Sequence, residues 1–387
     1  MTSAMKTKKQ PFDRNSPENV ALRAEIVHGA FLREGTMAAF PTCFPGATIP
    51  IPADESRITA LTVADGGIVY GGTSGRRTHL FYGLFHGATG MVFDVGVAEG
   101  ANRCAAVCCA GGQFFAFVNG PAGGRVVACP LATLPFDLLQ EWSFTREPLR
   151  EVGSVGSEPI VHALGVKSGA LVIVTETRLL TLDVAAGRLE PVAEVRCAGR
   201  MAIGSQSGVF GLEGTEYLWR YDAASRRFDR HSVRLPAGAW GRASLFWARD
   251  GRTGMLYTAD SEGALYAFSE ERGVGPSVGR APVAPVGPMA VTFDDRLFGF
   301  CGDGIARMFC YDPLLKRVDD LGVAVSTLQR RRYGYVFGDA VTGRDGQIFF
   351  GEDDDLGHLW LYFPRIRDAQ ALAQQGTIKS NDKPNSD

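Results

Sequence analysis

The feature that most constrains the fold is a short apolar phrase that recurs along the chain. It is clearest near the C-terminus, where residues 351–364 read GEDDDLGHLWLYFP. Degraded copies occur upstream as THLFYG at 78–83, YLWRYD at 217–222, ALYAFS at 264–269 and RMFCYD at 307–312. Copies that return about every 40 to 50 residues are typical of repeat proteins, in which each unit packs against its neighbours.

Each repeat has the pattern of a small antiparallel sheet. Residues 58–96 contain four short apolar runs separated by turn residues, which predicts four strands. Similar units run at about 103–145, 161–195, 199–235, 243–281, 288–323 and 333–363. Helical periodicity is nearly absent from these units. Seven four-stranded units predict an all-β fold, a seven-bladed β-propeller of antiparallel blades.

The two ends of the chain complete this domain plan. We expect a flexible tail at 1–17, a single propeller domain at 18–366, and a short helix-like segment with a polar tail at 367–387. The helical pattern covers Arg367–Gln375, and residues 36–56 are predicted to be an irregular connection. The last unit is one strand short. We predict that Ala24–Phe31 supplies this strand and closes the ring, which would hide an unpaired sheet edge.

Composition excludes several classes of function. The net charge of −2 provides no overall attraction to nucleic acid or to a membrane surface. No apolar run approaches the roughly 20 residues that span a bilayer, and the N-terminus lacks the apolar region of a signal peptide. The eight cysteines form no paired CxxC motifs, which favours buried thiols in a reducing compartment and predicts a cytoplasmic protein. Nucleotide-binding, acyl-hydrolase and metalloprotease motifs are absent.

The HLFxY phrases and the GEDDDLGHLWLYFP segment resemble those of bacterial seven-bladed propellers of the polysaccharide-lyase and sugar-processing type. The resemblance covers about residues 58–363 and is architectural. It implies that first strands line a central channel. It also implies that the loops entering first strands, and those between second and third strands, share the ligand face.

Basic and aromatic residues recur at these two loop positions. The positions that enter first strands hold Arg57, Arg103, His162, Arg200, Arg242 and the pair Arg332 and Tyr333. The positions that precede third strands hold His79, Arg178, Tyr217, Arg307 and His358. A chain that is almost neutral overall is thus predicted to gather cations and tyrosines at one rim.

This set of side chains suits β-elimination on a uronic acid sugar. An Arg fork binds a carboxylate, and a His or Tyr can move protons near neutral pH. The predicted function is therefore a lyase acting on acidic oligosaccharides at the mouth of the channel. The predicted catalytic residues are His162, Tyr333, His79 and His358. The predicted substrate-binding residues are Arg103, Arg200, Arg242, Arg307, Arg178 and Tyr217.

A structural role is the alternative for each of these residues. His79 and His358 occupy equivalent repeat positions and could bind neighbouring loops, while the Arg residues could pair with Asp54, Glu55, Glu158 or the acidic run at 352–355. The alternative function is a non-catalytic propeller that binds a carbohydrate or a protein. We expect no cofactor; calcium at 352–355 and a Mn²⁺ or Zn²⁺ site made by His79, His162 and His358 are minor alternatives. The expected partner is an anionic small molecule or oligosaccharide.

Overall fold

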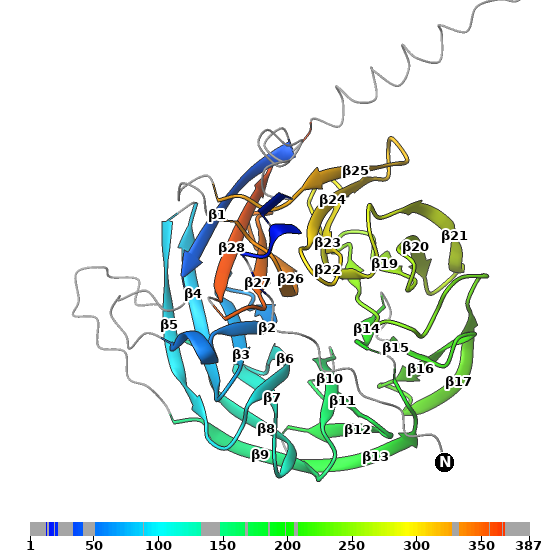
Figure 1. Cartoon of the computed structure of the whole chain (residues 1–387). Helices are drawn as coiled ribbons and strands as arrows, with labels where there is room; N and C mark the ends of the chain where they lie inside the picture. Colours follow the sequence, from blue (N-terminus) through cyan, green and yellow to red (C-terminus); the bar gives the residue numbers. More distant parts are fainter. Residues whose placement is uncertain are drawn as a thin grey trace, which may run out of the picture.

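The structure is a computed structural model. It describes residues 13, 15–18, 20–21, 34–41, 51–87, 89–132, 148–166, 169–184, 186–197, 199–204, 208–326, 333–355, 357–365 and 367. Seven four-stranded antiparallel sheets form a ring around a central channel (Figure 1). The seven-bladed propeller predicted from the sequence is confirmed. No helix in the described part of the chain is long and apolar enough to cross a bilayer.

In the first four blades, the strands run in chain order from the channel outwards. A short 3-10 turn, η1 (Ala53–Glu55), precedes the first of these blades. Blade 1 contains β2 (Arg57–Val63), β3 (Val69–Ser74), β4 (Thr78–His86) and β5 (Thr89–Ala98). Blade 2 contains β6 (Arg103–Ala110), β7 (Gln113–Gly120), β8 (Gly123–Pro130) and β9 (Arg150–Gly156). Blade 3 contains β10 (Ile160–Gly165), β11 (Leu171–Thr175), β12 (Arg178–Asp183) and β13 (Arg188–Glu194). Blade 4 contains β14 (Ala202–Ile203), β15 (Gly208–Glu213), β16 (Tyr217–Asp222) and β17 (Arg227–Arg234).

The remaining three blades complete the ring. Blade 5 contains β18 (Ala248–Arg249), β19 (Leu256–Ala259), β20 (Ala264–Ser269) and β21 (Gly273–Arg280). Blade 6 contains β22 (Val286–Val291), β23 (Leu297–Cys301), β24 (Arg307–Asp312) and β25 (Arg317–Gly322). Blade 7 contains β26 (Phe337–Thr342), β27 (Ile348–Glu352) and β28 (His358–Pro364), and its outermost strand is β1 (Gly35–Pro41).

The second strands explain why the repeats have continuous apolar runs. Every residue of β11, β23 and β27 is buried, because both faces of each sheet pack against neighbouring blades. Aromatic side chains fill the space between blades, as where the Tyr70 ring stacks on Phe114 at 4.8 Å between centroids. Outer strands such as β17 contain only partly buried and exposed positions. The core therefore lies between blades, and the channel is lined by the first strands.

The ring closes through the N-terminal segment, as predicted, but the strand differs from the prediction. β1 pairs with β28 in antiparallel register, with Met37 opposite Tyr362 and Ala39 opposite Trp360. The expected irregular connection at 36–56 is therefore wrong at 36–41, because Met37 and Ala39 alternate into the core shared with blade 6. The predicted strand Ala24–Phe31 lies outside the described residues.

Two other predicted boundaries adjoin residues that lie outside the described ranges. The fourth strand of blade 2 is β9 (Arg150–Gly156), beyond the expected limit of 145, because residues 133–147 intervene between it and β8. Of the helix-like segment, only Arg367 is described. The domain bounds of 18–366 stay a prediction, since residue 366 itself and most of the residues that follow residue 18 up to 33 lie outside the described ranges.

Candidate functional site

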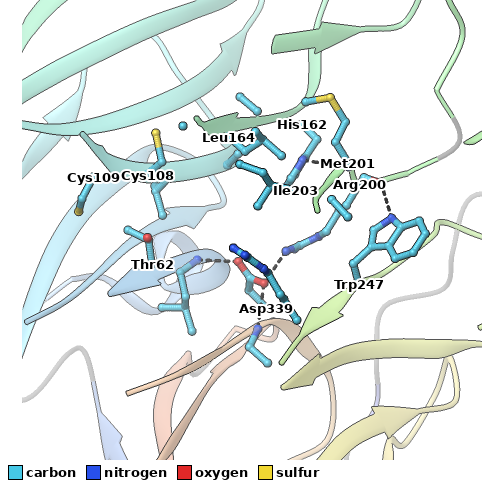
Figure 2. Close-up of a pocket in the computed structure, with 18 of the residues that line it drawn as sticks. Thr62, Cys108, Cys109, His162, Leu164, Arg200, Met201, Ile203, Trp247 and Asp339 are labelled. Atoms are coloured by element: carbon cyan, nitrogen blue, oxygen red, sulfur yellow. Dashed lines mark hydrogen bonds and ion pairs between the residues drawn. The ribbon is translucent and has the colours of Figure 1, made fainter. Parts of the chain in front are cut away.

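A cavity of about 340 Å³ lies in the central channel (Figure 2). Its walls come from the inner strands of every blade except blade 6, together with Trp247, which precedes β18, and Leu256, which begins β19. The lining includes the last residues of several inner strands, Gly165, Ile203 and Arg249, and Cys109, which is next to the last residue of β6. The cavity therefore extends towards the face on which inner strands end, which is opposite to the face predicted from the sequence.

Arg200 crosses the channel and limits the cavity on the other side. Its guanidinium forms an ion pair with Asp339 and donates to the carbonyl oxygens of Gly338 at 2.7 Å and Thr59 at 3.2 Å. It also lies over the Phe246 ring, 4.8 Å from the centroid. Arg200 enters blade 4, whereas its partners belong to blades 7 and 1. Its cation is thus neutralised by a link across the ring.

The Asp339 carboxylate accepts hydrogen bonds from three groups within the channel. These are the backbone N–H groups of Leu61 at 2.6 Å and Ala340 at 2.9 Å, in addition to the Arg200 guanidinium. Burial raises the pKa of Asp339, and the charge of Arg200 and the two N–H donors oppose this effect. The Arg200–Asp339 pair is therefore a closed structural unit at one end of the cavity.

His162 lines the cavity as a neutral ring. Its Nδ1 accepts the backbone N–H of Met201 at 3.1 Å, so the neutral ring carries its proton on Nε2. Burial, with a smaller contribution from Arg200, lowers the pKa of His162 to about 3. The side chain stays neutral, and the nitrogen that could act as a base is occupied by Met201.

Arg249 is a candidate binding side chain that the sequence pattern did not indicate. It ends β18, lines the cavity and is exposed. Among the described residues, no carboxylate lies within ion-pair distance of it. A signal was available, because the other inner strands end in Val63, Ala110, Gly165, Ile203, Val291 and Thr342, none of which is charged. The repeated basic positions in the sequence indicate only the loops of the opposite face.

The cysteines of the cavity are unreactive. Burial raises the pKa of the Cys109 thiol to about 12, and it raises the pKa of Cys108 further. Neither thiol forms a thiolate near neutral pH, so neither is a nucleophile there. In the described ranges, no group of three or more His, Cys, Asp and Glu side chains could hold a metal ion.

Several predicted rim arginines are neutralised by carboxylates. Arg178 Nε lies 3.2 Å from Glu158, and Arg307 Nη2 lies 2.8 Å from Asp320. Arg57, which shares their rim, is bound to Asp353 of blade 7 at 2.9 Å. These contacts match the structural alternative for these arginines. They leave little positive charge on this part of the rim.

The two repeat-equivalent histidines are also bound within the blades. His79 Nε2 lies 2.7 Å from Glu55, and its Nδ1 lies 3.2 Å from Asp94. His358 Nδ1 lies 2.9 Å from Glu352. Both rings are buried, and neither lines the channel cavity. Substrate access to them would require movement of the surrounding loops.

The other predicted residues are dispersed. The Tyr217 ring packs against His231 at 4.9 Å, and Tyr333 forms an isolated bridge with Val325. Arg103 is exposed, and Arg242 lines a separate cavity at the rim of blade 5. Only His162 and Arg200 of the predicted set line the channel cavity. The predicted gathering of the full set around one pocket is not seen, because several of these side chains are held by nearby carboxylates and others lie away from the channel cavity.

The comparisons place the fold among known propellers. No protein-family model and no curated protein matches the chain. A streptogramin B lyase structure is similar with a TM-score of 0.62 at 10% identity, over 87% of this chain and 99% of that chain. The virginiamycin B lyase from Staphylococcus aureus is similar with a TM-score of 0.60 at 8% identity, over 85% and 99% of the two chains.

The extracellular domain of a putative hybrid two-component system from B. thetaiotaomicron is also similar. Its TM-score is 0.57 at 12% identity, over 88% of this chain and 42% of that chain. These structure neighbours are seven-bladed propeller proteins, and the resemblance is one of architecture. A shared fold at such low sequence identity does not show that the function is shared.

Proposed function

We propose that the protein binds a small organic anion in its channel cavity. The observation that carries this proposal is Arg249, a cation without a carboxylate partner in the described structure, next to a cavity whose other end is closed by the neutralised Arg200–Asp339 pair. A guanidinium with open donors suits a carboxylate, which it can bind through two parallel hydrogen bonds.

The other lining residues define the kind of anion that fits. Leu164, Ile203, Leu256 and Trp247 contribute apolar wall, and the Thr62 hydroxyl and the His162 Nε2–H add two donors. A volume of about 340 Å³ is near the lower end of the range of about 300–1,000 Å³ for ligand sites. These features favour a compact carboxylic acid with an apolar part.

Replacement of Arg249 tests this proposal. Arg249→Gln should weaken the binding of a small carboxylate by roughly 10- to 100-fold, because a hydrogen bond to a charged group contributes about 1.5–3 kcal/mol. Isothermal titration calorimetry with a panel of small carboxylic acids gives the measurement. Arg252→Gln is the matched control, since Arg252 lies in the next turn and is already paired with Asp295. Absence of any binding, or equal binding by the Arg249 variant, would contradict the proposal.

Elimination on a uronate sugar is the second candidate function. Two of the similar solved structures are lyases that this chain matches over 99% of their length. In such a reaction the proton at C5 is removed, the C4–O bond breaks, a C4=C5 double bond forms and the leaving oxygen gains a proton. Arg249 could hold the carboxylate, and the neutral His162 ring could form a hydrogen bond from Nε2–H to the leaving oxygen, while water supplies the proton that this oxygen gains. The described channel residues provide no obvious base, so binding alone is the first proposal.

Ultraviolet absorbance separates the two candidates. A lyase incubated with uronate oligosaccharides produces an unsaturated product that absorbs near 235 nm, whereas a binding protein gives a titration signal without any rise in absorbance. A rise that persists in both His162→Gln and Arg249→Gln would place the chemistry outside the channel.

A further inference from the structure

We propose that a second cavity, at the rim of blade 5, binds an acidic sugar residue of a glycan. This cavity has a volume of about 680 Å³ and shares no lining residue with the channel cavity. Its walls are the linker at 237–239, Arg242, the loop between β19 and β20, and the end of β21. Inner strands begin on the face that holds this rim cavity, whereas the channel cavity extends towards the face on which they end. The two cavities are therefore independent, and the inference does not rest on the channel proposal.

Two arginines give the rim cavity open positive charge. Arg242 and Arg280 are both exposed, and neither has a carboxylate within ion-pair distance in the described structure. Arg280 Nη1 donates only to the backbone oxygen of Glu262, at 2.6 Å. The rim arginines of blades 3 and 6, Arg178 and Arg307, are instead paired with Glu158 and Asp320. Blade 5 therefore differs from these blades in presenting two guanidinium groups to solvent.

The acidic residues of the cavity have different roles. Asp260 is buried, and its carboxylate accepts the backbone N–H groups of Ala239 at 3.1 Å, Glu262 at 3.0 Å and Ala264 at 2.9 Å. These bonds occupy Asp260 and fix the loops. The Glu262 carboxylate is exposed and makes no ion pair within the described ranges. It remains available as an acceptor for ligand hydroxyl groups.

Two positive side chains and one negative side chain in the rim cavity favour a ligand that has both a carboxylate and hydroxyl groups. A sugar acid offers a carboxylate for the arginines and hydroxyl groups for Glu262, so these three side chains each gain a partner. A simple anion such as phosphate offers few donors to Glu262, whose charge repels it. A neutral sugar leaves both arginines without a partner.

The floor of the cavity is rigid before any ligand arrives. Tyr266 is buried, and its ring packs on Trp240 with centroids 4.7 Å apart. Trp240 Nε1 donates to the oxygen of Pro236 at 2.9 Å. The linker approaches so closely that a Cβ on Gly238 would lie 2.8 Å from Trp240 Nε1 and 2.9 Å from the Tyr266 hydroxyl. A floor fixed in this way reduces the ordering cost of binding.

Calorimetric titration of the full chain with digalacturonate tests the inference, with galactose and inorganic phosphate as comparison ligands. Arg242→Gln and Arg280→Gln should each weaken digalacturonate binding at least tenfold. Glu262→Gln should also weaken it, while strengthening the binding of phosphate. Arg272→Gln, an exposed site at the opposite end of blade 5, is the matched control and should leave affinity unchanged.

Three outcomes would overturn the inference. They are absence of digalacturonate binding, equal affinity for galactose or phosphate, and unchanged affinity in both arginine variants. Loss of binding in Arg249→Gln alone would move the sugar to the channel, which would overturn the rim site and leave the channel proposal standing. If small carboxylic acids do not bind in the channel while digalacturonate still binds, the channel proposal would be overturned and the rim site would stand.

Discussion

At the scale of the residue, His79 shows how a predicted catalytic group has become part of the fold. Its two ring nitrogens face carboxylates of Glu55 and Asp94, and Glu55 is also bound by Arg76 and Arg77. Burial by itself lowers the pKa of His79, but the hydrogen bonds to Asp94 and Glu55 outweigh it, and the pKa is raised above its ordinary value. The protonated ring is therefore the form that stabilises the blade.

This raised pKa predicts how stability depends on pH. The contribution of His79 is complete below the unfolded pKa of about 6.5 and is lost as pH rises through the higher folded value. In urea unfolding, the stability difference between the wild type and His79→Gln should be largest near pH 6 and should shrink towards pH 9. His231→Gln, at an exposed position on β17 away from this cluster of carboxylates, is the comparison variant. A difference that grows with pH would contradict this assignment.

The sequence could identify candidate rim residues but could not pair them. Arg57 and Asp353 are 296 positions apart, and Arg200 and Asp339 are 139 positions apart. Residue type gives the charge of a side chain, whereas its availability to a ligand depends on which carboxylates the ring brings near. The spacing of the repeats gives the blade position of each arginine, but Arg242 lines a separate rim cavity and Arg200 lines the channel cavity, so the single shared pocket that was predicted is not formed.

At the scale of the element, the closing strand illustrates the same limit. A missing strand in the last repeat predicted that the N-terminal segment would close the ring, which is correct. Its exact residues depend on contacts with β28 and blade 6, where Met37 and Ala39 join a buried cluster with Phe298 and Tyr362. Local pattern alone did not separate β1 from the segment before it, since both contain short apolar runs.

Single substitutions within β1 test its place in the core. Met37 is fully buried, whereas the adjacent Thr36 is exposed. Met37→Ala should lower the free energy of unfolding by about 2–5 kcal/mol, because a buried side chain is lost and a cavity remains. Thr36→Ala should change it by less than about 0.5 kcal/mol. Urea titration followed by tryptophan fluorescence measures both, and equal effects would mean that β1 does not seal the ring.

At the scale of the whole molecule, the Arg200–Asp339 pair links opposite sides of the ring. Blade-to-blade packing and the β1–β28 pairing connect only neighbours, whereas this pair joins blade 4 to blades 7 and 1 through the channel. Arg200 also anchors blade 5, because Trp247 Nε1 donates to its backbone oxygen at 3.0 Å. The residue predicted to bind substrate is therefore expected to hold the channel in shape.

A double-mutant cycle distinguishes this structural role from a direct role in binding. Arg200→Met alone should lower the free energy of unfolding by about 3 kcal/mol, because it leaves the buried Asp339 carboxylate without its cation. Adding Asp339→Leu should restore most of that loss, since apolar groups then replace both charges. Unfolding in urea gives the stabilities, and calorimetry with the carboxylate bound by Arg249 gives the affinity of the double variant, which should stay within threefold of the wild type. If Arg200→Met abolished binding without any loss of stability, Arg200 would be a ligand-binding residue and the channel link would have no structural role.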